Sequence, residues 1–170
     1  MAAASVGHRL APEYPFPKGP EDCFDAVENY LKNAESLHGA PVRLIGGGQL
    51  AGAHLAVLTT IHLLKTHPGF MLAGLCSILG NLEPLRGRLP IASVTIGTED
   101  LRVGDTVTIA TMRMTFGEAI VKMFPGCPHG FICFPAEALI EAGDAMRETK
   151  TFIEERTGKA RGESCWLGSL

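Results

Sequence analysis

Short apolar runs alternate with longer stretches in which apolar residues recur at helical spacing along most of this 170-residue chain. The clearest unit spans residues 42–64, where an apolar run is followed by three glycines and then by apolar positions every three to four residues. This order predicts a strand, a tight turn and a helix. Further runs of strand length lie at 70–78, 90–96 and 119–124, and helical patterns lie at 21–37, 105–116 and 136–155.

Strands that alternate with helices predict an α/β fold with a mostly parallel, doubly wound sheet of about five strands. Residues 5–10 are the candidate for one further strand, which Pro12 cuts short. We expect one partial domain over residues 1–157, because no repeat or linker divides the chain. Residues 158–170 are expected to form a frayed tail, with Trp166 as its only large apolar anchor.

Composition narrows the possible partners. Fifteen Lys and Arg stand against eighteen Asp and Glu, without a basic block, so neither nucleic acid nor an anionic membrane surface is an expected partner. No apolar stretch reaches the roughly 18 residues of a membrane span. The five cysteines form no C-x-x-C pair, which predicts neither a disulfide framework nor a metal site and favours a reducing, cytoplasmic location.

Candidate chemistry follows the predicted strands, because ligands of open α/β sheets bind at the carboxyl ends of the strands. The glycine turn lacks G-x-G-x-x-G and a P-loop lysine, which argues against a nucleotide site. Polar or glycine-rich segments follow three of the runs, at 48–52, 97–100 and 125–131. An acidic segment therefore precedes a histidine segment along the chain.

Three motifs in this order resemble the α/β-hydrolase fold-3 family, the esterases related to hormone-sensitive lipase. Residues 8–17 read HRLAPEYPFP and are similar to the family's YRLAPE-PFP segment. Residues 97–100, with Asp105, are similar to its G-T-x-D acid loop, and residues 125–131 to its PGxPHGF histidine loop. The resemblance implies ester hydrolysis on a small ester-type ligand by a serine, histidine and aspartate, without a metal or organic cofactor.

The resemblance implies a role for individual positions. Asp100 would be the carboxylate that orients the imidazole, and His129 would be the general base. The family's AGAHL segment fixes the register of the nucleophile turn, which places Leu50 where the family has its serine. The surrounding turn and oxyanion positions would be Gly48, Gln49, Ala51 and Gly52. A leucine carries no lone pair that can attack a carbonyl, so we expect a catalytically impaired protein.

A second departure concerns the HGGG segment, which completes the oxyanion hole in the family and has no counterpart in this sequence. The family strand that leads to it lies between the strands matched here by residues 5–10 and 42–45. We therefore expect residues 5–10 either to pair directly with residues 42–45 or to be disordered. A further strand of the same chain between them would contradict this assignment.

Other interpretations stay open. Asp100 is also a plausible cap for the helix that the pattern starts near residue 105. Cys127 lies two residues before His129, and Ser77 follows a predicted strand, so each is an alternative nucleophile with weaker support. A noncatalytic binding or scaffold protein, possible as a homodimer through an exposed sheet edge, is the alternative function; a gene fragment without a selected role is a third.

Overall fold

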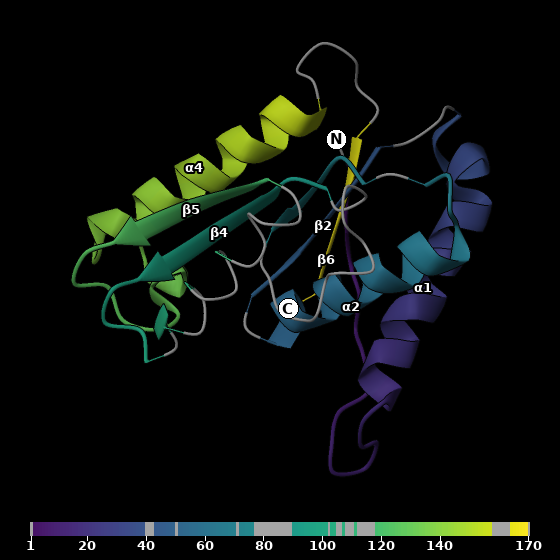
Figure 1. The fold of residues 1–170 in the computed structure, drawn as a ribbon, viewed down its shortest axis with the longest axis horizontal. Helices are drawn as coiled ribbons and strands as arrows, with labels where there is room; N and C mark the ends of the chain where they lie inside the picture. Colours follow the sequence, from purple (N-terminus) through teal and green to yellow (C-terminus); the bar gives the residue numbers. More distant parts are fainter. Residues whose placement is uncertain are drawn as a thin grey trace.

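The computed structural model describes residues 2–39, 43–49, 51–70, 72–76, 90–101, 103–104, 107, 111, 118–157 and 164–169. The elements with complete bounds are, in chain order, β1 (Ala2–Ser5), α1 (Lys18–His38), β2 (Arg43–Gly48), α2 (Ala51–Thr66), β3 (Gly74–Cys76), β4 (Ala92–Gly97), β5 (Ala119–Phe124), the 3-10 helix η2 (Phe131–Cys133), α4 (Ile140–Thr157) and β6 (Ser164–Ser169). The strands form one six-stranded sheet in the order β1-β6-β2-β3-β4-β5, and every neighbouring pair is parallel (Figure 1). The predicted α/β fold with a parallel sheet is confirmed.

The position of β6 contradicts two expectations. Residues 164–169 form a strand that pairs on one side with β1 and on the other with β2. The prediction of a frayed tail is therefore wrong for these residues. Direct pairing of the first two strands, or disorder of the first, is wrong as well, because a strand of the same chain lies between them. The physical reason is that both strand edges present unpaired N–H and C=O groups, and β6 satisfies them.

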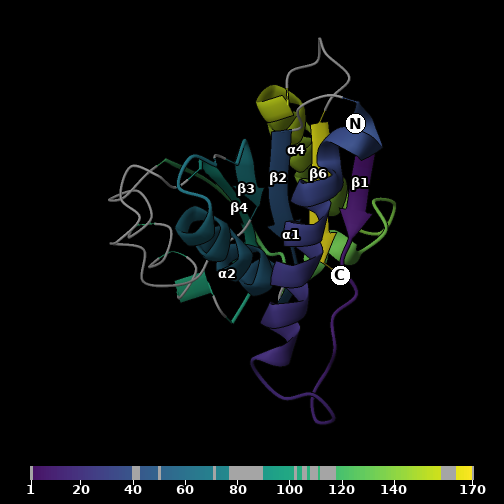
Figure 2. The same cartoon turned by 90° about the vertical axis from the view of Figure 1, so that its right-hand side faces the viewer.

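Helices cover both faces of the sheet. In Figure 2, α1 and α2 lie in front of the strands and α4 lies behind them. On the first face, a buried apolar cluster joins α1, α2 and β2 through Val27, Leu63 and Leu44. On the second face, the buried Phe152 of α4 packs where a side chain on Gly74 of β3 would stand, 3.1 Å from its ring. The sheet is therefore doubly wound, as predicted.

Element boundaries differ from the sequence prediction in particular places. The first strand occupies residues 2–5 rather than 5–10, and the strand predicted over 70–78 is described only at 74–76. Helix α2, β4 and β5 lie within two residues of the predicted ranges. Strand β2 runs on to Gly48, so the three glycines predicted to form the turn belong to the strand, and the turn starts after them. The helix predicted over 105–116 lies largely outside the described residues, as does Ser77.

The connection between β1 and α1 is tied to α1 at Arg9 but carries apolar side chains on the surface. Arg9 binds Asp22, in the second turn of α1, through its backbone N–H and its guanidinium, at 2.6–3.0 Å. After Arg9, Leu10 and Phe16 are 65% and 80% exposed.

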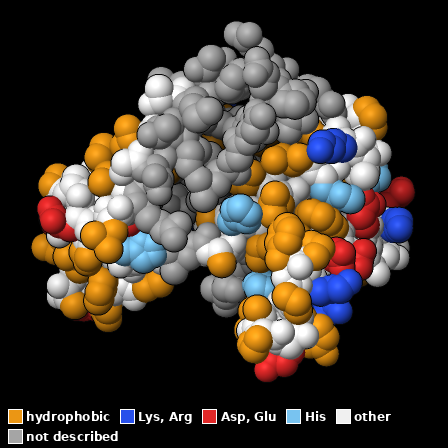
Figure 3. All heavy atoms as spheres, turned by 60° about the horizontal axis from the view of Figure 1, so that its bottom comes forward, with side chains coloured by type: hydrophobic (Ala, Val, Ile, Leu, Met, Phe, Trp, Pro, Cys, Tyr) orange, Lys and Arg blue, Asp and Glu red, His pale blue; other side chains and the backbone are white. Residues whose placement is uncertain are grey.

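Charges of both signs are mixed on the described surface. In Figure 3, acidic and basic side chains lie beside one another on the right-hand side, so this part of the described surface presents no patch of a single charge.

Candidate active site

The carboxyl ends of β4 and β5 bring the acid and histidine segments together. The parallel register places Gly97 opposite Phe124, so the loops that follow start side by side. The backbone N–H of Thr98 donates to the Phe124 carbonyl at 3.0 Å, and the N–H of Glu99 donates to the Cys127 carbonyl at 3.0 Å. In return, the N–H of Gly126 donates to the Thr98 hydroxyl at 2.8 Å. Three hydrogen bonds thus join the two loops.

Gly97 is the residue that allows this approach. A Cβ at this position would lie 2.0 Å from the Cys127 carbonyl oxygen and 2.6 Å from its carbonyl carbon. Both atoms belong to the backbone, so no side-chain rotation relieves the overlap. The glycine of the G-T-x-D motif is therefore required by the packing of the two loops.

Asp100 and His129 form the polar pair of this site. The Nδ1 atom of His129 lies 2.7 Å from Oδ2 of Asp100. The Asp100 side chain is 10% exposed, whereas that of His129 is 45% exposed. When Nδ1–H donates to the carboxylate, Nε2 carries the lone pair of a neutral imidazole and is the atom free to take up a proton. The sequence prediction that these two residues lie together agrees with this geometry.

Two turns and a buried cluster fix the histidine loop. Gly126 and Gly130 both have φ near +71°, a left-handed conformation that glycine adopts without steric cost. Gly130 leads directly into η2, and Phe131 of η2 is buried with Cys127 against the first half of α4, at Ala142 and Ala145. His129 therefore stands between two anchored positions, which limits the freedom of its backbone.

The turn between β2 and α2 is as tight as the sequence predicts. A Cβ on Gly48 would lie 2.3 Å from the carbonyl carbon of Gly52 and 2.8 Å from the backbone nitrogen of Ala53. The N–H of Gly52 donates to the Gln49 carbonyl at 2.8 Å, and Ala51 begins α2. Leu50 itself lies outside the described residues. The backbone around it is a strand-to-helix turn in which position 48 accepts only glycine.

One contact links this turn to the histidine loop, and sequence reasoning missed it. The exposed Cys133, in η2, donates its thiol to Oε1 of Gln49 at 3.0 Å. The residues at 48–49, at 100 and at 129 therefore lie at one end of the sheet, where the parallel strands have their carboxyl ends. Cys133 lies four positions after His129, and its place after a histidine loop was the only signal in the sequence that pointed to it.

The alternative nucleophile Cys127 is unsuited to that role in this geometry. Its side chain is buried, and burial raises the pKa of the Cys127 thiol. A thiol with a raised pKa supplies less of the thiolate that attacks carbonyl carbon. The cap interpretation of Asp100 concerned a helix starting at residues 105 or 106, which lie outside the described residues.

The acid–histidine pair does not line the cavity found in the described part of the chain. That cavity, of about 40 Å³, lies between α1, α2 and β2 and is lined mainly by apolar residues such as Cys23, Val27 and Leu55. Within the described ranges, no three His, Cys, Asp or Glu side chains are grouped to hold a metal ion. No described helix combines the length and the hydropathy that crossing a bilayer demands.

A comparison with protein families identifies the chain. A family model described as the α/β-hydrolase fold matches residues 1–86, which is just over half of the sequence. This chain belongs to the α/β-hydrolase family. The match includes β1, α1, the tight turn and α2, so it covers the segment that contains Leu50.

Relatives of this α/β-hydrolase are esterases and lipases. It is 38% identical over 64 residues to lipase 2 of a Moraxella species, which is 38% of this chain and 15% of that protein. It is 39% identical over 54 residues to the carboxylesterase NlhH of Mycobacterium tuberculosis, which is 32% of this chain and 17% of that protein.

A solved structure extends the likeness of the fold beyond the matched segment. A hormone-sensitive lipase from a metagenome library superposes with a TM-score of 0.74 at 23% identity. The superposition covers 89% of this chain and 64% of that one. The chain therefore spans less than two thirds of this relative's length.

Proposed function

We propose that this chain is an α/β-hydrolase-like protein of carboxylic-ester hydrolase descent that is catalytically impaired. The observation that carries the proposal is the 2.7 Å contact between Asp100 and His129. This contact lies at the carboxyl ends of the strands, as does the tight turn that follows Gly48. This contact supports the roles of Asp100 and His129 as the acid and the base of an ester hydrolase, while position 50 holds a leucine. The ligand class that fits this descent is a small ester.

The pair would act as a base without a nucleophile to activate. In a complete triad, His129 would take the proton of a serine hydroxyl at Nε2 and pass it to the leaving alcohol, and Asp100 would stabilise the imidazolium. Without that hydroxyl, the remaining route is direct activation of water by His129. In a well-studied serine hydrolase, loss of the nucleophile lowers kcat by a factor on the order of 10⁶. We expect a comparably low rate here.

Hydrolysis of a short-chain nitrophenyl ester tests the proposal. The unaltered chain is expected to hydrolyse the ester at a rate on the order of 10⁶-fold below that of a complete triad, and His129→Ala is expected to remove that residual rate. The Leu50→Ser variant is expected to gain hydrolysis that a further His129→Ala change removes, with Leu50→Ala as the matched control for loss of the leucine side chain. Turnover by the unaltered chain that depends on His129 and reaches an ordinary enzyme rate of about 1 s⁻¹ or more would refute the impairment.

The Leu50→Ser variant also separates two causes of impairment. If it folds and stays inert, the absence of a counterpart to the HGGG donors limits the rate, because the developing oxyanion then lacks hydrogen-bond partners. If it is active, the substituted nucleophile is the cause. Circular dichroism of the variant establishes that it is folded.

A noncatalytic binding or scaffold role is the second candidate function. The observation that favours it is the sheet order, in which β1 and β5 are the outer strands and each presents one edge that no strand of the described residues pairs with. Such an edge can pair with the edge of a second copy. Light scattering after size-exclusion chromatography would detect this homodimer, and a monomer at all concentrations would exclude it.

We place the protein in the cytoplasm, where the cysteines that are free in the described residues would stay reduced.

A further inference from the structure

The position between β1 and β2 is a slot for one extended segment. Within the described residues, β1 pairs only with β6, and β2 separates β6 from the rest of the sheet. Residues 2–5 pair with 165–168, and residues 43–48 pair with 164–169. Without β6, two facing strands would each present a row of unpaired N–H and C=O groups.

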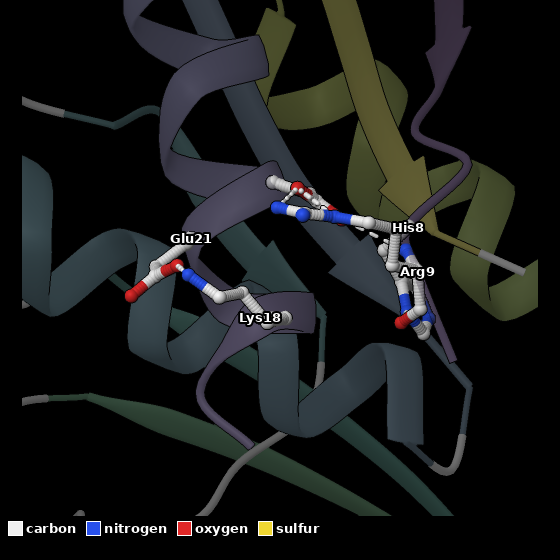
Figure 4. A network of polar contacts seen from close by, with 5 residues as sticks. His8, Arg9, Lys18 and Glu21 are labelled. Atoms are coloured by element: carbon white, nitrogen blue, oxygen red, sulfur yellow. Dashed lines mark hydrogen bonds and ion pairs between the residues drawn. The ribbon is translucent and has the colours of Figure 1, made fainter. Parts of the chain in front are cut away.

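Contacts that do not involve β6 tie the segment after β1 to the rest of the fold. The backbone N–H and the guanidinium of Arg9 contact Asp22 of α1 at 2.6–3.0 Å, and Figure 4 shows Arg9 reaching from this segment to α1. Helix α1 is in turn held over β2 and α2 by the cluster containing Val27, Leu44 and Leu63. The segment after β1 is therefore anchored beside α1, and β6 supplies the pairing that places β1 in the sheet.

The recognition offered by the slot is mainly that of backbone groups. A parallel strand inserted there finds donors and acceptors on both sides, and residues 164–169 carry no charged side chain that would have to be desolvated. Any second copy of this chain carries the same uncharged segment. Residues 164–169 of that copy can pair with β1 and β2 in the same register, through the same backbone hydrogen bonds.

We propose that the β1–β2 slot is a strand-acceptor site for a second copy of this chain, which exchanges residues 164–169 reciprocally. Exchange of an identical element makes the same hydrogen bonds between two copies as within one. The equilibrium between the monomer and the exchanged dimer therefore depends on the connection between α4 and β6. The proposal goes beyond the proposed function, because it requires neither an ester ligand nor the Asp100–His129 pair.

Residues 158–163 decide whether β6 reaches the slot of its own copy. Helix α4 ends over β3, since Arg156 and Phe152 contact the position of Gly74. Strand spacing and register put Ser164 about 12 Å from Gly74, two strands away and two residues back along the sheet. The intact connection reaches up to about 25 Å, which is sufficient. With residues 158–162 deleted, the reach is about 8 Å, which is too short.

The decisive experiment is deletion of residues 158–162 in the otherwise complete chain, with mass measured by light scattering. We expect a dimer at micromolar concentration, where the intact chain is a monomer. Adding Leu167→Pro is expected to abolish the dimer, because a proline inside a strand paired on both sides removes a ladder hydrogen bond. Lengthening the connection by six Gly and Ser residues is expected to give a monomer.

A folded monomer from the deletion variant would overturn the proposal, as would a dimer that survives Leu167→Pro. An edge-to-edge dimer would form irrespective of the length of the connection, so the two kinds of dimer are distinguishable.

If the deletion variant fails to fold, the intact chain decides. Two copies with different affinity tags are unfolded in urea together and refolded at about 1 mM, near the effective concentration of a short tether, or at about 10 μM. Doubly tagged dimers at the higher concentration, absent when both copies carry Leu167→Pro, support the exchange. Refolding to monomers alone at both concentrations overturns it.

Discussion

Replacing Gly97 by alanine tests whether the acid and histidine loops are held together as described. The added methyl group would lie 2.0 Å from the carbonyl oxygen of Cys127 and 2.9 Å from its Cβ. Because backbone atoms cannot rotate away, the segment 125–129 must move by about 1 Å or more to restore van der Waals separation. Such a movement breaks the hydrogen bonds of Thr98 and Glu99 to that segment.

The expected destabilisation follows from these terms. Two backbone hydrogen bonds contribute about 1 kcal/mol each, and overpacking adds about 1–3 kcal/mol. A loss of about 3–5 kcal/mol lowers the melting temperature of a chain of this size by about 6–20 °C. Gly69→Ala is the matched control, because a Cβ there meets nothing within 4 Å. Thermal unfolding followed by circular dichroism measures both; equal melting temperatures for the two variants would refute the close approach.

Further predictions concern stability away from the candidate site. The ion pair with Arg9 lowers the pKa of Asp22 to about 2, so the pair stabilises the fold above the ordinary carboxyl pKa and this contribution is lost as the pH falls from about 4 to about 2. In Asp22→Asn, urea unfolding at pH 5 and at pH 2 should show a smaller loss of stability on acidification than in the unaltered chain. Phe152→Ala should cost about 3–5 kcal/mol because the ring is buried against β3. Phe16→Ala, at an 80% exposed position, should leave the urea midpoint nearly unchanged.

The elements that the sequence predicts well are those with a local signal. The apolar run and the helical spacing over residues 42–64 predict a strand followed by a helix, which are β2 and α2, although the three glycines belong to the strand. A general rule, that the carboxyl ends of parallel strands share one end of the sheet, predicts that the loops of Asp100 and His129 lie near one another, and the family resemblance implies the pairing of the two side chains. The contact of Cys133 with Gln49 has no such rule, since it depends on the side-chain packing of two loops.

The elements that the sequence predicts poorly are the two strands at one side of the sheet. Residues 2–5 are three alanines and a serine, which are weak strand formers, so local propensity does not identify them as a strand. Residues 164–169 are short and contain no regular alternation that identifies a strand. Both are strands because each lies beside another backbone with unpaired groups. Their structure is set by pairing with residues far away in the sequence, and local propensity carries no record of that.

The strand between β1 and β2 bears on the interpretation of the family resemblance itself. A same-chain strand in this place was expected to contradict the assignment of the neighbouring strands, yet the family model matches residues 1–86, which include both neighbours. The error lay in treating a strand position as a property of one sequence segment. A position within a sheet is defined by the hydrogen-bonding groups of its two neighbours and by their separation, and here β6 pairs with both neighbours while Arg9 and Asp22 tie the segment after β1 to α1. An uncharged segment can occupy the position if its connection is long enough to reach it. The length of the connection therefore decides which segment forms this strand, whether or not that segment corresponds to the family's strand.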